Sequence, residues 1–148
     1  MIRKLLACAA IVLAAAPAMA ADPIANAADI VKAADWKQMQ SVEVVIAEHS
    51  YTPETITLQA GKPYKIVLKN TGTKPHYFTA PDFFKGIATR KAQTKEAEFK
   101  APYFNAIEIN ENGVAELFFV PATKGSFDVY CTIEDHREKG MEGKIVVE

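Results

Sequence analysis

Cysteine is scarce in this chain of 148 residues, which contains only Cys8 and Cys131. Basic residues are not in excess either, because 17 Lys and Arg residues face 18 Asp and Glu residues. A chain without a basic excess gives no support to sequence-independent nucleic-acid binding. The sequence shows no internal repeat or low-complexity linker, and its hydrophobic content of 49% is too high for a disordered protein. Length and composition together indicate one globular domain.

Long apolar runs are also few, and the clearest one lies at the N-terminus. Arg3 and Lys4 precede an apolar stretch over residues 5–16, and Pro17–Ala20 ends in an A-x-A pattern. This pattern is typical of a secretory signal peptide cleaved after Ala20, so we expect a periplasmic protein. The alternative is a retained N-terminal anchor, but the stretch is too short to span a bilayer comfortably. No second run of that length follows. We therefore expect no membrane span.

Cleavage after Ala20 would change the cysteine count from two to one. Residues 5–8 resemble a lipoprotein cleavage box, but the hydrophobic stretch follows Cys8 instead of preceding it, so we expect Cys8 to leave with the signal peptide. The remaining 128 residues carry 15 basic and 18 acidic side chains, a net charge of −3. Cys131 then has no partner for an intrachain disulfide in an oxidising compartment. It is an inert core residue, a reactive thiol or a metal ligand.

The remaining sequence predicts a short helical extension followed by an all-β domain. Residues 21–40 are rich in alanine, with apolar residues at loose helical spacing, and we expect one or two helical turns that dock through Trp36. From Ser41 onward, short runs alternate apolar and polar residues and are separated by turn signals, which is typical of strands. These runs cover residues 42–46, 55–59, 65–69, 107–110, 114–120, 127–131 and 144–147. Seven or so such strands favour a β-sandwich.

Residues 81–94 interrupt the strand pattern. They place Phe83, Phe84 and Ile87 at helical spacing and contain few β-branched residues, so a short helix is expected there. We interpret Phe83 and Phe84 as hydrophobic packing and not as part of a cofactor site. The predicted organisation is a signal peptide over 1–20, an extension over 21–40 and one domain over 41–148.

The segment from Tyr130 to Gly143 contains three potential metal ligands at five-residue intervals, namely Cys131, His136 and Met141. They fall on one loop between two predicted strands, and the glycines at 140 and 143 permit sharp bends. A thiolate, two imidazoles and a weak thioether form the ligand set of blue-copper electron-transfer sites. Met141 could instead fill a gap in the core.

A second imidazole must come from His49 or His76, because the chain has only three histidines. We favour His76, which follows the strand ending near Asn70 and so lies at the same end of a sandwich as Cys131. His49, beside Glu48, is a surface histidine or part of a second, weaker copper site. Zinc seldom recruits a thioether, whereas soft sulfur ligands favour copper. A dinuclear copper centre would need a second cysteine nearby, and a multicopper oxidase or nitrite reductase would need more domains and histidines.

Three stretches make the sequence similar to the cupredoxins, the small blue-copper proteins. Residues 51–61 resemble an early strand of the family with its Ala-Gly turn, and residues 69–76 resemble the segment with the first histidine ligand. The motif Cys131-x4-His136-x4-Met141 followed by Gly143 resembles the C-terminal ligand loop, with the spacing closest to rusticyanin-like members. The resemblance covers residues 41–148. It implies a Greek-key β-sandwich.

The resemblance also implies one type 1 copper ion held by His76, Cys131, His136 and an axial Met141. The function that it implies is single-electron transfer between redox proteins, such as a cytochrome or a copper protein or oxidase, by a monomer that is not an enzyme. A periplasmic copper-handling protein for tolerance, storage or delivery is the alternative, and a redox-silent accessory module is a third hypothesis. After signal cleavage only two methionines, Met39 and Met141, would remain, which weighs against a buffering role.

Two departures from the family pattern bear on the expected site. Many cupredoxins carry an asparagine directly after the first histidine, where it ties the two ligand loops together, and this chain has Tyr77. Rusticyanin-like loops often have Pro-Gly before the second histidine, and this chain has Glu134 and Asp135. These carboxylates would lower the reduction potential by favouring Cu(II), or would mark a rim for partner docking.

Overall fold

A computed structural model describes residues 22–148, and the predicted signal peptide lies outside the described residues. The helical elements are α1 (Ala27–Ala33), the 3-10 turn η1 (Trp36–Gln38) and α2 (Pro81–Lys85). The strands are β1 (Gln40–Ala47), β2 (Ser50–Thr52), β3 (Thr55–Leu58), β4 (Tyr64–Asn70), β5 (His76–Thr79), β6 (Ile87–Gln93), β7 (Glu98–Phe99), β8 (Ala106–Ile109), β9 (Val114–Pro121), β10 (Gly125–Tyr130) and β11 (Glu142–Val147).

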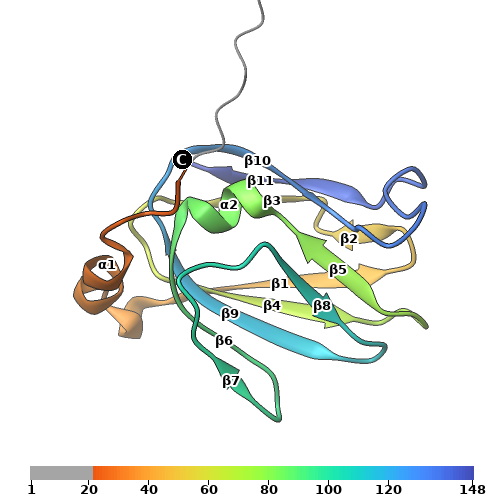
Figure 1. Ribbon diagram of the computed structural model, residues 1–148, viewed down its shortest axis with the longest axis horizontal. Coiled ribbons are helices and arrows are strands. Elements are labelled where there is room, and N and C mark those ends of the chain that lie inside the picture. The colour runs from red at the N-terminus through yellow and green to blue at the C-terminus, as the bar shows by residue number, and fades with distance from the viewer. Residues whose placement is uncertain (1–21) are drawn as a thin grey trace, which may run out of the picture.

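The strands form two sheets that pack face to face (Figure 1). One has the order β2-β1-β4-β9-β6-β7 and the other the order β3-β11-β10-β5-β8. Two neighbouring pairs are parallel, β1 with β4 and β3 with β11, and the other pairs are antiparallel. The predicted all-β, cupredoxin-like sandwich is confirmed, together with one short helix and a short helical extension.

Alternating burial along the strands builds the core between the sheets. In β4, Tyr64, Ile66 and Leu68 are buried, while the residues between them are more exposed. An apolar residue at every second position points to the same face of a sheet, so each strand contributes one side to the core. Phe78, Phe83, Phe84 and Phe119 are among the largest fully buried side chains. The interpretation of Phe83 and Phe84 as packing residues is therefore confirmed.

The prediction for residues 81–94 was too simple, because the helix there ends at Lys85. Pro81 starts α2 at a position where its missing N–H costs nothing, and Gly86 caps the C-terminal end. Residues 87–93 instead form β6, which pairs with β9 and is irregular between Thr89 and Lys91. An irregular register breaks the strict alternation that the sequence argument relies on. The remaining strands outside the prediction, β2, β5 and β7, are only two to four residues long.

The N-terminal extension packs against β6 through Trp36, as predicted. The indole N–H of Trp36 donates a hydrogen bond of 2.9 Å to the carbonyl of Val31, which ties η1 to α1. The guanidinium of Arg90 lies 4.5 Å from the centre of the Trp36 ring. This cation–π contact holds the extension on the sheet at the end opposite the β10–β11 loop (Figure 1). Among residues 22–148, no helix has the length and apolar character needed to cross a membrane.

Candidate metal centre

The candidate ligands gather where three segments meet at one end of the sandwich. His76 is the first residue of β5, Cys131 follows β10 directly, and Met141 directly precedes β11. His136 lies in the loop that joins β10 to β11, which projects beyond the sheets in Figure 1. The predicted loop between two strands is thus present. His76 lies on β5, which pairs with β10 where Thr79 is opposite Tyr130, and this pairing brings His76 to the same end of the sandwich as Cys131.

Backbone hydrogen bonds close the β10–β11 loop at its base. The Cys131 N–H donates to the carbonyl of Met141 at 3.1 Å, and the Met141 N–H donates to the carbonyl of His136 at 2.9 Å. Gly140 has a φ of 96°, a conformation that a residue with a Cβ adopts at a cost. Gly143 permits close packing of two backbone segments and not a bend, because a Cβ at this position would collide with the carbonyl oxygen of Glu54. These bonds fix the loop backbone on both sides of His136.

Three side chains form a compact donor group. Metal-binding atoms of His76, Cys131 and His136 all lie within 4.8 Å of one another. The Cys131 Sγ lies 3.5 Å from His136 Nδ1, and the Tyr77 N–H donates towards the same sulfur with an N to S distance of 3.5 Å. The imidazole centres of His76 and His136 are 5.1 Å apart. One thiol and two imidazoles therefore converge on one small volume.

Burial of this polar group has a cost that a metal ion would remove. The exposed fractions are 0% for His76, 1% for Cys131 and 5% for His136. Both ring nitrogens of His76 are buried without a hydrogen-bond partner among the described residues. A buried polar group without a partner costs about 1–3 kcal/mol. Burial, with a contribution from neighbouring His136, lowers the pKa of His76 and favours the neutral imidazole that binds metals. The residues present fit a copper ion.

Met141 lies in the hydrophobic core with an exposed fraction of 0%. Its backbone contacts both Cys131 and His136 through the hydrogen bonds of the loop base. This position is compatible with the predicted axial role and with packing, the two alternatives that the sequence left open.

Asn70 organises the segment that leads to His76, although it was not predicted from the sequence as a site residue. Its side chain is 1% exposed and donates to the carbonyls of Lys74, Ile109 and Asn110 at 2.7, 3.0 and 3.1 Å. Its Oδ1 accepts the N–H of Gly72 at 2.9 Å. The Asn-Thr-Gly signature of an Asx turn at residues 70–72 was the available signal. Asn70 thus anchors the loop between β4 and β5.

Tyr77 does not tie the ligand loops together with its side chain. Its hydroxyl donates to Glu108 at 3.0 Å, away from Cys131, and its carbonyl accepts the hydroxyl of Tyr51 at 2.5 Å. The backbone N–H of Tyr77 contacts the Cys131 sulfur instead. The hydroxyls of Thr79 and Thr132 approach to 3.4 Å and link β5 to the residue after Cys131. In this chain a backbone contact and a pair of threonines therefore link the two ligand segments, which is the role of the asparagine in the family pattern.

The charged residues of the loop largely pair with one another. Asp135 accepts Lys139 Nζ at 2.8 Å, and this hydrogen bond lowers the pKa of Asp135. Arg137 contacts Glu142 at 3.0 Å and lies 4.2 Å from the centre of the Tyr130 ring. Glu134 is exposed at a φ of 36°. These residues form a largely solvated face of mixed sign, and the charge of Asp135 is balanced locally.

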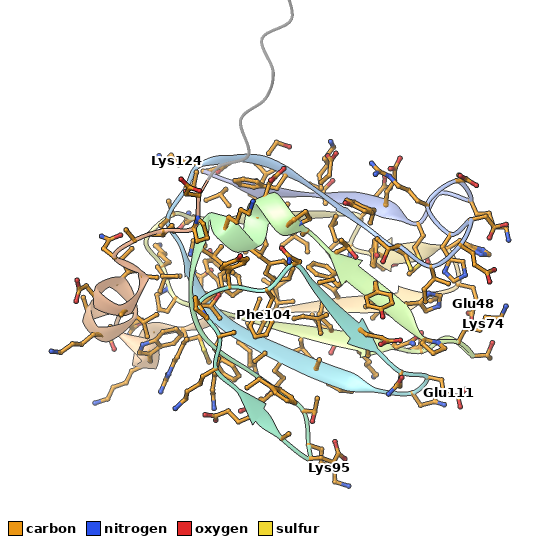
Figure 2. The ribbon with its side chains drawn as sticks, viewed as in Figure 1. Glu48, Lys74, Lys95, Phe104, Glu111 and Lys124 are labelled. Carbon is orange, nitrogen blue, oxygen red and sulfur yellow. The ribbon has the colours of Figure 1, made fainter. Side chains whose placement is uncertain are left out.

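His49 lies outside the donor group but next to it. It is half-buried in the turn between β1 and β2, and its ring packs edge-on against His136 with centres 5.0 Å apart. The neighbouring Glu48 binds the backbone N–H of Thr73 at 2.5 Å and its hydroxyl at 3.0 Å. These bonds lower the pKa of Glu48 to about 2. Figure 2 shows Glu48 and Lys74, the residue after Thr73, at the same end of the molecule.

The family of this chain follows from its similarity to known proteins. A family model described as "Cupredoxin-like domain" matches residues 6–147. The chain belongs to the cupredoxin-like family. A curated relative, the copper-resistant cuproprotein CopI of Rubrivivax gelatinosus, is 29% identical over 114 residues. The match covers 75% of this chain and 68% of the relative.

Solved structures similar to this cupredoxin include both small and large copper proteins. Reduced auracyanin from Roseiflexus castenholzii matches with a TM-score of 0.54 and 16% identity, covering 74% of this chain and 97% of auracyanin. A multicopper oxidase from Pseudomonas thermotolerans matches with a TM-score of 0.61 and 17% identity, covering 78% of this chain and 31% of the oxidase. Copper nitrite reductase from Nitrosomonas europaea matches with a TM-score of 0.58 and 12% identity, covering 74% of this chain and 49% of the reductase. At these identities the likeness shows the fold alone, and the chain spans half or less of the two enzymes.

Proposed function

We propose that this cupredoxin is a periplasmic type 1 copper protein that carries single electrons between redox proteins. The observation that carries the proposal is the buried, convergent group of one thiol and two imidazoles, all within 4.8 Å. In this proposal His76, Cys131 and His136 hold one copper ion and Met141 is a weak axial ligand. Bound copper would supply the one-electron couple between Cu(II) and Cu(I).

The protein's contribution would be to keep the ligands in one arrangement in both oxidation states. The hydrogen bonds from Cys131 N–H to Met141 and from Met141 N–H to His136 restrain the loop, and Asn70 restrains the segment before His76. A preorganised site changes little when charge is transferred. The near-complete burial of the donor group excludes water, and the Tyr77 N–H directed at the Cys131 sulfur would stabilise a thiolate.

Partner docking is expected at the end of the sandwich that carries His136. His136 is the most exposed of the three donors, although only 5% of its surface is accessible. We propose that a cytochrome or a copper protein or oxidase docks there on a monomer. The burial of all three donors limits the access of a small substrate to the site, which supports a carrier and not an enzyme. Export to the periplasm is supported by the signal-peptide pattern of residues 1–20.

Copper handling is the second candidate function, and one specific observation favours it. The relative from R. gelatinosus is named a copper-resistant cuproprotein. In that role the same donor group would retain or deliver copper, and rapid electron exchange would not be required.

Two rates measured on the copper-loaded protein separate these functions. The first is stopped-flow reduction of the Cu(II) form by a reduced c-type cytochrome, and the second is loss of copper to excess EDTA. A carrier reacts with the cytochrome on the millisecond-to-second scale and keeps its copper for hours. Slow reduction combined with copper loss within minutes would favour copper handling. Met141→Leu should alter the visible spectrum if Met141 is axial, whereas Met39→Leu, at the end of η1, is the matched control.

A further inference from the structure

The three histidines of this chain lie together, although the proposed site uses only two. Both His49 and His76 pack against His136, with ring centres 5.0 and 5.1 Å from it. The whole sequence contains no other histidine. One imidazole at this end of the molecule therefore has no role in the site described above.

His49 lies in a tight turn and has a left-handed backbone conformation. It follows Glu48 in a two-residue turn that connects Ala47 of β1 to Ser50 of β2. Its φ of 62° lies in the left-handed region, which is uncommon for residues other than glycine, although asparagine, aspartate and histidine adopt it more often than the rest. A residue held in this region at a candidate site is a reason to look for a function.

The His49 imidazole is free to bind a ligand. Among the described residues, its side chain makes no hydrogen bond, while the carboxylate of neighbouring Glu48 is engaged by Thr73. Exposure increases in steps from His76, at 0%, to His136, at 5%, to the half-buried His49. The three rings thus form a series from the buried donor group towards solvent.

We propose that His49 is an uptake ligand that binds copper arriving from solvent and passes it inward to His136, Cys131 and His76. The inference rests on the proposed copper site and adds a fourth residue to it. Imidazole nitrogen binds copper strongly, so a solvent-facing histidine beside the site can hold the ion before the buried donors do. The transfer is a ligand exchange without an electron: the bond to His49 breaks, the bond to Cys131 forms, and the thiol proton leaves to solvent.

The test compares copper uptake by the apo-protein and its variants. His49→Asn removes the imidazole and suits the left-handed backbone, and His49→Phe keeps an aromatic ring without a nitrogen donor. Ser50→Ala, at the next position of the same hairpin, is the matched control. Each protein is mixed with Cu(II) sulfate, and growth of the intense thiolate-to-copper absorption is followed by stopped flow. Copper loss to EDTA is then measured on the loaded proteins.

The expected result is an uptake rate at least tenfold lower in both His49 variants, with an unchanged final spectrum. Release to EDTA should slow by a similar factor, because a residue on the path accelerates transfer in both directions. Uptake at the wild-type rate in either variant would overturn the inference. Faster uptake and release would also overturn it, since His49 would then restrict the access of copper to the buried donors. If the wild-type apo-protein gives no intense band, the proposed copper site itself fails.

Discussion

Replacement of Asn70 by alanine is expected to destabilise the apo-protein by about 2–6 kcal/mol. Two of the hydrogen bonds that Asn70 makes are buried, those with the carbonyl of Ile109 and with the N–H of Gly72. The carbonyls of Lys74 and Asn110 are partly buried and can turn to water. Two buried groups left without partners, at about 1–3 kcal/mol each, give the estimate. That is a large part of a typical domain stability of about 5–15 kcal/mol.

Urea unfolding of the metal-free protein, followed by circular dichroism, measures this effect. With a slope of about 2 kcal/mol per molar urea, the midpoint should fall by about 1–3 M. Asn110→Ala is the matched control, because the Asn110 side chain is exposed and makes no hydrogen bond to another described residue. The metal-free form is used because bound copper would add its own stabilisation. A free energy of unfolding for Asn70→Ala within about 0.5 kcal/mol of the control would refute the assigned role of Asn70.

Three further predictions test other parts of the structure. Glu48→Gln should lower the urea midpoint at pH 6 and have less effect at pH 3. The fold lowers the pKa of Glu48 from an ordinary 4.5 to about 2, so the Glu48 carboxylate stabilises the folded state fully above pH 4.5, and this contribution is lost as the pH falls towards 2. Gly143→Ala should destabilise the fold by about 1–3 kcal/mol in thermal unfolding, because the new Cβ would collide with the carbonyl of Glu54, a backbone atom. Trp36→Ala should expose residues 22–38 to trypsin, measured by mass spectrometry, while leaving the spectrum of the copper-loaded protein unchanged.

Each of these predictions has a clear contrary outcome. An equal loss of stability at pH 6 and pH 3 in Glu48→Gln would show that the carboxylate charge is not responsible. Wild-type thermal stability of Gly143→Ala would mean that β11 and the Glu54 carbonyl have room to separate. A changed copper spectrum in Trp36→Ala would mean that the extension influences the opposite end of the sandwich.

Strands with strict alternation could be predicted from the sequence, and strands with an irregular register could not. Val44 and Ile46 in β1, or Tyr64 and Ile66 in β4, alternate because one face of each strand is buried. In β6 the register shifts between Thr89 and Lys91, and the apolar residues at its start fit a helix equally well. Tertiary pairing with β9 decides the outcome there, and a local pattern does not contain that information.

For the candidate site, the ligand loop could be predicted because its residues are close in the sequence. Cys131, His136 and Met141 lie within one connection between two strands, so their proximity follows from local structure. The contacts of Asn70 with Ile109 and the pairing of Thr79 with Thr132 join distant segments. They depend on how the sheets are assembled, so the spacing of residues within one segment does not reveal them.

The central claim, that Cys131 in a buried group with His76 and His136 holds copper, is tested most directly by the visible and EPR spectra of the Cu(II)-loaded protein. The account predicts an intense thiolate-to-copper absorption and a narrow copper hyperfine splitting at one copper per chain. Both features should disappear in Cys131→Ser. A weak, featureless visible spectrum in the wild-type protein, or an intense band that persists in Cys131→Ser, would contradict the claim.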